Sequence, residues 1–149
     1  DEVVREVARL LNGEILGRRV QLAIEAGPEE RPVFAGRVEV QQILINLIVN
    51  AIDAVRDQPV EQRRVTMRTR TVVGGSAIEV ADTGAGIPPA ILDDIFRPFF
   101  TTKPNGLGMG LAVSRYLVEA HGGTLSAANQ PEGGAVFTMV LPAAEEVST

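Results

Sequence analysis

The stretch TTKPNGLGMGL (residues 101–111) combines residue types that could bind an anion. Gly106, Gly108 and Gly110 alternate directly before an apolar helical run, and Lys103, the only lysine, stands three residues ahead of them. Alternate glycines let successive backbone N–H groups turn toward one point, and the following helix adds its N-terminal donors and dipole. The pattern predicts a phosphate site with Lys103 as a mobile charge. The alternative is a flexible loop without a ligand. It is neither a P-loop nor a dinucleotide-binding fingerprint.

A second candidate is a stripe of polar residues on the otherwise apolar segment 38–57. Spacings of four, four, three and four place five side chains on one face of a helix: Gln42, Asn46, Asn50, Asp53 and Asp57. A helix that is apolar nearly all round is buried, and an unpaired buried amide costs about 1–3 kcal/mol. Two kinds of partner remain open. The stripe faces solvent and neighbouring loops, or it faces a polar ligand or hydrated cation, for which an amide oxygen is a suitable hard ligand.

A third candidate is Asp82, which ends the strand-like segment SAIEVAD and precedes a glycine loop. An ionised carboxylate only accepts hydrogen bonds, so Asp82 could accept one from an exocyclic amine such as N6 of adenine. Gly84 and Gly86 would let the backbone lie close to a flat ring. The alternative is an Asx-turn in which Asp82 binds its own loop.

Periodicity and turn residues predict the elements that position these candidates. We expect helices over 1–12 (ended by Gly13), 37–57 and 111–121 (closed by Gly122-Gly123), a short helical turn over 90–95, and long loops over 82–89 and 96–106. We expect strands over 19–26 and 32–36, a hairpin of 65–73 and 76–82 turning at Gly74-Gly75, and a last strand pair over 123–130 and 134–142. This order predicts an α+β fold, with helices on one side of a mixed sheet.

Composition narrows the function classes. The chain has 149 residues, the size of one domain, and 45% of them are hydrophobic. The lack of cysteine excludes disulfides, zinc–thiolate clusters and a thiol nucleophile, and it suits a reducing cytoplasm. The net charge of −5 argues against nucleic-acid binding. We find no signal peptide and no apolar run near the ~20 residues of a membrane helix, so we expect no direct membrane contact.

Four motifs occur along the chain in the order NLIVNAIDAV (46–55), DTGAGIP (82–88), FRPFFTTK (96–103) and GLGMGL (106–111). This ordered set resembles the N, G1, F and G2 boxes of histidine-kinase catalytic domains. These domains belong to the ATPase superfamily that includes gyrase, the heat-shock chaperone and mismatch-repair ATPases. The resemblance covers residues 1–142, with 143–149 as a frayed tail. FFTTK, GLGMGL and EAHGG are most similar to the nitrogen-regulation and oxygen-sensing branch. The implied fold is the two-layer Bergerat sandwich, a mostly antiparallel mixed sheet with helices on one face.

The resemblance implies roles for the candidate residues, with ATP and Mg2+ as cofactors. Asn50 would bind magnesium that bridges the phosphates, Asn46 would contact the phosphates or the metal's waters, and Asp82 would recognise adenine N6. Residues 96–110 would form the ATP lid, and Lys103 would approach the terminal phosphate. Further nucleotide contacts are expected from Asp53, Gly84, Gly86, Ile87, Thr102, Gly106, Leu107, Gly108, Met109, Gly110 and Leu111.

Three residues refine this expectation. The only histidine, His121, lies at a predicted helix end, so we expect it to be structural and the phosphoacceptor to lie elsewhere. Gly36 stands where similar kinases often carry an acidic residue, and glycine is a tolerable N-cap. Asn46 matches the position of a glutamate base in the hydrolysing relatives. An amide cannot take a proton from water, which favours transfer to a histidine over hydrolysis.

The resemblance therefore implies transfer of the γ-phosphoryl group from Mg-ATP to a histidine on a separate dimerisation domain, and then to an aspartate on a response regulator receiver domain. We expect a cytoplasmic domain that is monomeric alone, within a homodimeric full protein whose membrane anchoring stays open. The alternatives are an anti-sigma-factor serine kinase, which the FFTTK pattern disfavours, a nucleotide-dependent binding module without transfer, and a structural domain without nucleotide affinity.

Overall fold

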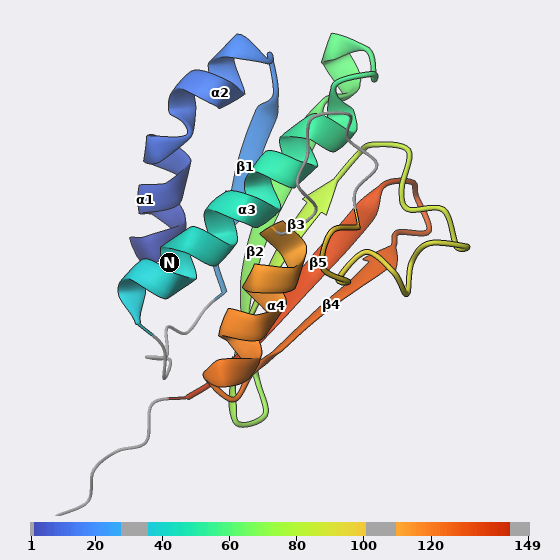
Figure 1. The fold of residues 1–149 in the computed structure, drawn as a ribbon. Coiled ribbons are helices and arrows are strands. Elements are labelled where there is room, and N and C mark those ends of the chain that lie inside the picture. The colour runs from blue at the N-terminus through green and yellow to red at the C-terminus, as the bar shows by residue number, and fades with distance from the viewer. Residues whose placement is uncertain (1, 28–35, 101–109, 144–149) are drawn as a thin grey trace, which may run out of the picture.

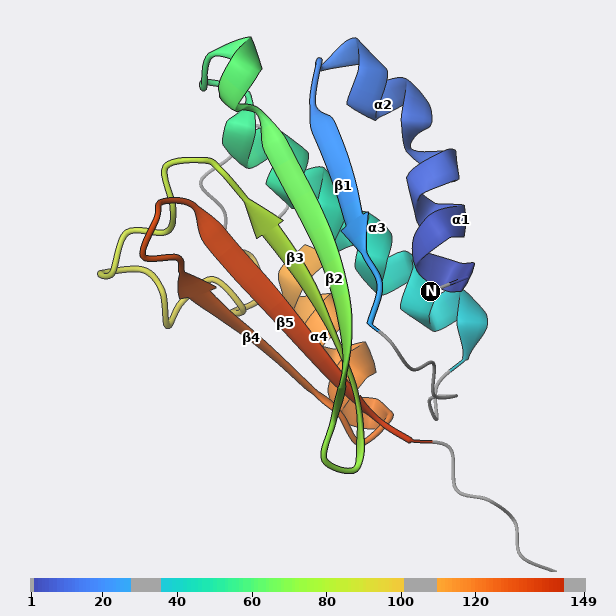
Figure 2. The same ribbon diagram turned by 180° about the vertical axis from the view of Figure 1, so that it is seen from behind.

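The α-helices of the described residues lie on the same side of a twisted sheet, as the two opposite views show (Figure 1, Figure 2). The computed structural model describes residues 2–27, 36–100 and 110–143. The helices are α1 (Glu2–Leu10), α2 (Asn12–Gly17), α3 (Arg37–Val55) and α4 (Gly110–Ala120), and a short 3-10 helix, η1, spans Val60–Gln62. The strands are β1 (Gln21–Glu25), β2 (Arg64–Val72), β3 (Gly75–Asp82), β4 (Thr124–Asn129) and β5 (Ala135–Pro142).

The five strands follow the order β1-β2-β3-β5-β4. Only β1 and β2 run parallel, with Gln21 opposite Arg64, and the other three pairings are antiparallel. A parallel pair needs a long crossover, and here α3 supplies it. The expected α+β sandwich, with a mixed and mostly antiparallel sheet and helices on one face, is confirmed.

The core lies between the sheet and α3, which packs on β2 and β3 while α4 packs on β4 and β5. Leu44, Leu47 and Ile48 of α3 are fully buried together with Met67 and Met139 of the sheet. Within the described residues, one helical stretch, Val38–Val55, is long and apolar enough to pass for a membrane span, with a mean hydropathy of 1.4. Its place against the sheet accounts for that composition, because a helix in this position needs several apolar faces.

Two predicted boundaries are wrong. Gly13 does not end the helical region, because α2 follows α1 almost without a break: the Leu11 N–H donates to Val7 O, and the Ile15 N–H donates to Leu11 O. Burial of Ile15 in the core explains why this second helix forms. The hairpin turns at Val73-Gly74 instead of Gly74-Gly75, since Val72 pairs with Gly75.

The other predicted elements agree with the structure after small shifts, or lie outside the described residues. Gly36 caps α3 in an extended conformation, and α3 ends at Val55, two residues early. The predicted strand over 32–36 falls outside the described residues except for Gly36, and so does the tail beyond residue 143. The predicted turn over 90–95 is a run of hydrogen-bonded turns, in which the N–H groups of Ile91 and Asp94 donate to carbonyls three residues back.

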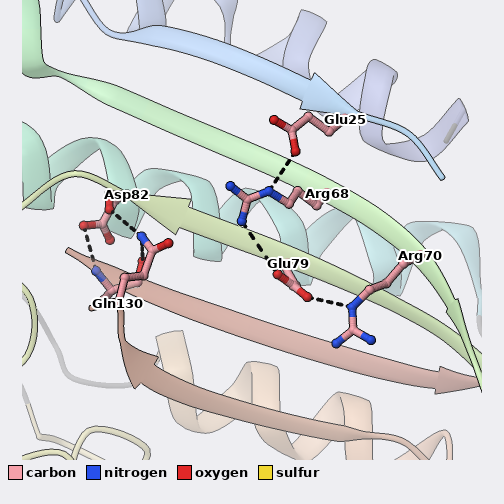
Figure 3. Close-up of polar contacts among 7 residues, drawn as sticks. Glu25, Arg68, Arg70, Glu79, Asp82 and Gln130 are labelled. Atoms are coloured by element: carbon pink, nitrogen blue, oxygen red, sulfur yellow. Dashed lines mark hydrogen bonds and ion pairs between the residues drawn. The ribbon is translucent and has the colours of Figure 1, made fainter. Parts of the chain in front are cut away.

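The open face of the sheet carries a ladder of charges across three strands (Figure 3). Arg68 Nε donates to Glu25 on β1 at 2.8 Å, and Arg70 Nε donates to Glu79 on β3 at 2.7 Å. Glu79 also lies 3.9 Å from Arg68 Nη1. Partly exposed pairs of this kind are each worth less than about 1 kcal/mol. The Arg68–Glu25 pair links the edge strand β1 to its register partner on β2, and the two Glu79 contacts link β2 to β3, on the face that no helix of the described residues covers.

Candidate active site

Asn46 joins α3 to the first turn of α4. Its Nδ2 donates to the carbonyl oxygen of Gly110 at 3.2 Å and to the hydroxyl of the fully buried Ser114 at 3.1 Å. A backbone carbonyl can only accept, so the amide nitrogen must face α4. Oδ1 then has no hydrogen-bond partner among the described residues. The free oxygen lies beside the N-terminus of α4, where the glycine loop ends.

The rest of the polar stripe divides between site and solvent. Asn50 is half-buried one turn after Asn46 on the same face of α3. Asp53 lies 3.5 Å from Nη1 of Arg18, in the α2–β1 turn. Gln42 is exposed, and so is Asp57 beyond the end of the helix. The ends of the stripe thus meet solvent and its middle faces neighbouring elements, as the first interpretation has it, and the ligand or cation interpretation stays a prediction.

Asp82, the last residue of β3, is only 3% exposed. Its Oδ1 accepts from the N–H of Gly84 at 2.9 Å and from the N–H of Ala135 at 3.3 Å. The first bond is the Asx-turn of the alternative interpretation, so that turn is present. No hydrogen bond to Oδ2 is found among the described residues. Since no fully buried side-chain oxygen or nitrogen there lacks a partner, Oδ2 must reach solvent.

Burial dominates the electrostatics of this carboxylate. Loss of hydration raises the pKa of Asp82 above its ordinary value, while the N–H groups of Gly84 and Ala135 oppose the shift. The two N–H bonds stabilise only Oδ1, whereas burial destabilises the negative charge of the whole carboxylate. A ligand that donates to Oδ2 would therefore stabilise the ionised form.

Both glycines after Asp82 are needed for close packing of the loop. A Cβ at position 84 would collide with the carbonyl oxygen of Ala54 on α3. Gly86 has a φ of +83°, and a Cβ there would lie 2.8 Å from Oδ1 of Asn129. The loop thus lies directly on α3 and on the end of β4. These contacts require the glycines even without a flat ligand.

Two functional candidates were missed in the sequence. Asn129 forms two hydrogen bonds with the backbone of Ile87, both at 2.7 Å. Gln130 Nε2 donates to the carbonyl oxygen of Asp82 at 3.0 Å (Figure 3). The only signal in the sequence is a pair of amides at a strand end before a proline and a glycine pair.

The start of the predicted lid is anchored in the core. The Phe96 ring packs edge-on against Phe137 of β5, with centroids 6.2 Å apart. The guanidinium of Arg115 lies 4.8 Å from the Phe96 ring centre. Most of the lid lies outside the described residues, including Thr102, Lys103, Gly106, Leu107, Gly108 and Met109. Gly110 opens α4, and Leu111 packs against the core.

His121 directly follows α4, which ends at Ala120, one residue earlier than predicted. Its Nδ1 lies 2.7 Å from the carbonyl oxygen of Leu117, and Gly122 turns the chain with a φ of +80°. The Gly123 N–H closes the helix on Val118 O at 2.9 Å. These contacts give His121 a role at the helix end.

The donor set fits magnesium better than a metal that needs a protein cage. The described ranges contain no group of three or more histidine, cysteine, aspartate or glutamate side chains that could hold a metal. Mg2+ usually binds through one or two protein oxygens, with water and phosphates in the other positions. The Asn46 Oδ1 beside the N-terminus of α4 and the Asn50 amide one turn later on α3 are oxygens of the kind that could serve such an ion.

The sequence matches the family described as "Histidine kinase-, DNA gyrase B-, and HSP90-like ATPase" over residues 35–145. Among curated proteins, it is 42% identical over 131 residues to the sensor protein FixL of Bradyrhizobium diazoefficiens, covering 87% of this chain and 25% of FixL. It is 36% identical over 132 residues to the C4-dicarboxylate transport sensor protein DctB of Rhizobium meliloti, covering 89% and 21%. The chain thus spans about a quarter of these relatives.

The catalytic domain of the histidine kinase ThkA superimposes with a TM-score of 0.81 at 31% identity, covering 95% of this chain and 91% of that one. Histidine kinase ThkA in complex with the response regulator TrrA matches with a TM-score of 0.80 at 30% identity (96% and 40%). Full-length ShkA in complex with AMPPNP matches with a TM-score of 0.82 at 26% identity (97% and 30%).

The fold and the family match define an ATP-binding domain of this ATPase class. Within the class, the chain belongs to the catalytic domains of sensor histidine kinases of two-component systems, and it resembles those of FixL and DctB.

Proposed function

We propose that this domain binds Mg-ATP between the C-terminal half of α3, the loop after β3 and the N-terminus of α4. One observation carries the proposal. Asp82 and Asn46 are each held by two hydrogen bonds, and each keeps one side-chain oxygen without a partner among the described residues. Such oxygens are oriented before a ligand arrives, which lowers the entropic cost of binding.

The base would bind at Asp82. The ionised Oδ2 accepts a hydrogen bond from the exocyclic N6 of adenine, and guanine offers no donor at that position. Gly84 and Gly86 keep the loop flat, and Ile87 adds an apolar contact at its far end. A charge-assisted bond in a largely buried position is strong. This arrangement supports adenine over guanine as the base.

The phosphates would bind at the other end of the site. Asn50 is the magnesium ligand, Asn46 contacts the phosphates or the metal's waters, and the first turn of α4, from Gly110 to Leu111, supplies N–H groups and a positive dipole. Bound Mg2+ neutralises charge on the β- and γ-phosphates. We assign further nucleotide contacts to Asp53 at the rim of the site and to lid residues that precede α4 in the chain: Thr102, Lys103, Gly106, Leu107, Gly108 and Met109.

The chemistry is in-line transfer of the γ-phosphoryl group. A neutral imidazole nitrogen of a histidine on a separate dimerisation domain attacks phosphorus, the bond to the β–γ bridging oxygen breaks, and ADP keeps the electron pair. The nucleophile needs no base, and the Asn46 amide could not act as one toward water. The phosphoryl group then passes to an aspartate of a response regulator, a partner class found bound to ThkA.

We infer that the domain works in the cytoplasm, where ATP is available, as part of a longer homodimeric kinase. The dimerisation domain and the receiver domain are its protein partners. The AMPPNP complex of ShkA supports ATP as the nucleotide for this fold.

Calorimetry with AMPPNP tests the binding half of the proposal. We expect binding in the micromolar to millimolar range that weakens in excess chelator. A titration with the corresponding guanosine analogue serves as the control and should give much weaker binding. Absence of AMPPNP binding with and without magnesium would contradict the proposed function.

Radiolabelled ATP tests the transfer half. The domain is mixed with the histidine-bearing domain of its full-length protein, and acid-labile label should appear on that domain. Binding without such label would indicate a nucleotide-dependent binding module. Acid-stable label on serine would indicate a serine kinase.

A further inference from the structure

Asn129, at the end of β4, holds one residue of the loop that follows Asp82. Its Oδ1 accepts from the Ile87 N–H and its Nδ2 donates to the Ile87 carbonyl oxygen, both at 2.7 Å. Each backbone group can play only one role, so the orientation of the amide is unambiguous. Asn129 and Ile87 are 42 residues apart in the chain. The side chain thus pairs with Ile87 as a neighbouring strand would.

Few other residues could take this place. Aspartate keeps the acceptor but loses the donor, and it would place a negative oxygen against the Ile87 carbonyl. Alanine loses both bonds. A longer side chain has little room, because the site of a Cβ on Gly86 already lies 2.8 Å from Asn129 Oδ1. The amide of Asn129 and the bare backbone of Gly86 therefore fit together.

The loop is held at both ends by neighbouring residues of the β4–β5 region. At the start of the loop, the backbone carbonyl oxygen of Asp82 accepts a hydrogen bond from Gln130 Nε2 (Figure 3). The side-chain Oδ1 of Asp82 accepts one from the Ala135 N–H. At its far end, Ile87 is held by Asn129 and packs against the core. One short segment, Asn129 to Ala135, thus contacts both ends of the loop, while the middle of the loop rests on other elements through Thr83 and Gly84.

We infer that Asn129 is a positioning residue for the nucleotide base. It fixes the separation between Asp82 Oδ2 and Ile87 without touching the base, so it sets affinity for adenine and discrimination against guanine. The inference rests on the proposed function, because it takes Asp82 as the acceptor for adenine. Asn129 itself is exposed, so removing its side chain should leave the fold largely intact.

The test compares Asn129→Ala and Asn129→Asp with Ser126→Ala, a matched control that is exposed on the same edge strand but on the opposite face. Affinities for ADP and GDP are measured by calorimetry, and melting temperatures report the fold. We expect Asn129→Ala to bind ADP about tenfold more weakly, equivalent to about 1.4 kcal/mol, with little change for GDP. Asn129→Asp should lose at least as much, and the control should match the wild type.

A second readout separates positioning from general destabilisation. In an Asp82→Asn background, Asn129→Ala should cause little further loss of ADP affinity, because the group that it positions has already lost its function. Equal losses for ADP and GDP, full additivity with Asp82→Asn, or wild-type ADP affinity in Asn129→Asp would each overturn the inference.

The same experiment distinguishes the inference from the proposed function. If the wild type fails to bind ADP, or if Asp82→Asn binds it normally, the proposed function fails and the inference fails with it. If those two proteins behave as proposed but Asn129→Ala binds like the wild type, only the inference fails.

Discussion

The guanidinium of Arg115 on α4 lies 4.8 Å from the centre of the Phe96 ring, which packs edge-on against Phe137. This stack joins the end of the turn-rich segment after β3 to α4 and to the sheet. Arg115 also pairs with Glu119 on its own helix at 3.2 Å. The segment that leads into the predicted lid therefore starts from a fixed point between two elements of the core.

Arg115→Met should destabilise the domain by about 1 kcal/mol, the sum of an exposed cation–π contact and a helical ion pair. Methionine keeps the bulk of the side chain and removes its charge. Urea unfolding gives the difference. Arg97→Met is the control, since Arg97 is 73% exposed and pairs only with Asp94 among the described residues. Equal losses in both variants would show that the Phe96 contact contributes nothing.

Asp82→Asn should weaken ATP binding by roughly 1.5–3 kcal/mol, the range for a hydrogen bond to a charged group. Its stability at neutral pH should be retained or improved, because the amide oxygen can still accept from Gly84 and Ala135 while the buried charge is gone. Calorimetry and thermal unfolding measure the two effects on one sample. Full nucleotide affinity in this variant would exclude the role of Asp82 at adenine.

The affinity for ATP should fall in acid earlier than an ordinary aspartate would predict. Oδ1 already accepts two N–H bonds, so a proton binds Oδ2 and turns the acceptor for N6 into a donor. Burial raises the pKa of Asp82, so binding is strong above that raised pKa and weakens as the pH falls through it.

The stability of the apoprotein should respond to Asp82 in the opposite direction. A carboxyl whose pKa is raised by folding stabilises the protein at low pH, and that contribution is lost as the pH rises through the folded pKa. Titrations of affinity and stability against pH check both signs, with Asp82→Asn as the reference that lacks these transitions. An identical acid limb of binding in this variant would assign the titration to another group.

Asn50→Ala should remove the dependence of nucleotide binding on magnesium, because the amide oxygen is the expected protein ligand. The measurement is ATP affinity with magnesium and with excess chelator. Gln42→Ala is the control, since Gln42 lies on the same stripe but is exposed. A variant that still binds better with magnesium would show that another residue is the ligand.

Local patterns predicted the elements well. The alternation of residues in β2 and β3 and the apolar periodicity of α3 are properties of single segments, so they could be read without a fold. The same holds for Asp82, whose place at the end of a strand before glycines is visible in the sequence. Gly13 misled the prediction, because burial of Ile15 outweighs the weak helix propensity of glycine.

The contacts between distant segments could not be read in the same way. Asn129 meets Ile87 only because β5 lies between β3 and β4 in the sheet, and no local pattern encodes that order. The parallel pairing of β1 with β2 is likewise a property of the assembled fold. Asp82 could therefore be predicted from the sequence, whereas the residues that surround it could be found only from the assembled fold.

The two hydrogen bonds of Asn46 also restrict how this fold could change its chemistry. A carboxylate at position 46 would face the carbonyl of Gly110, which can only accept, and would repel it. A glutamate at position 46, as a general base for water, would therefore disturb the first turn of α4. The identity of residue 46 is thus coupled to the structure at the start of α4 through these two hydrogen bonds.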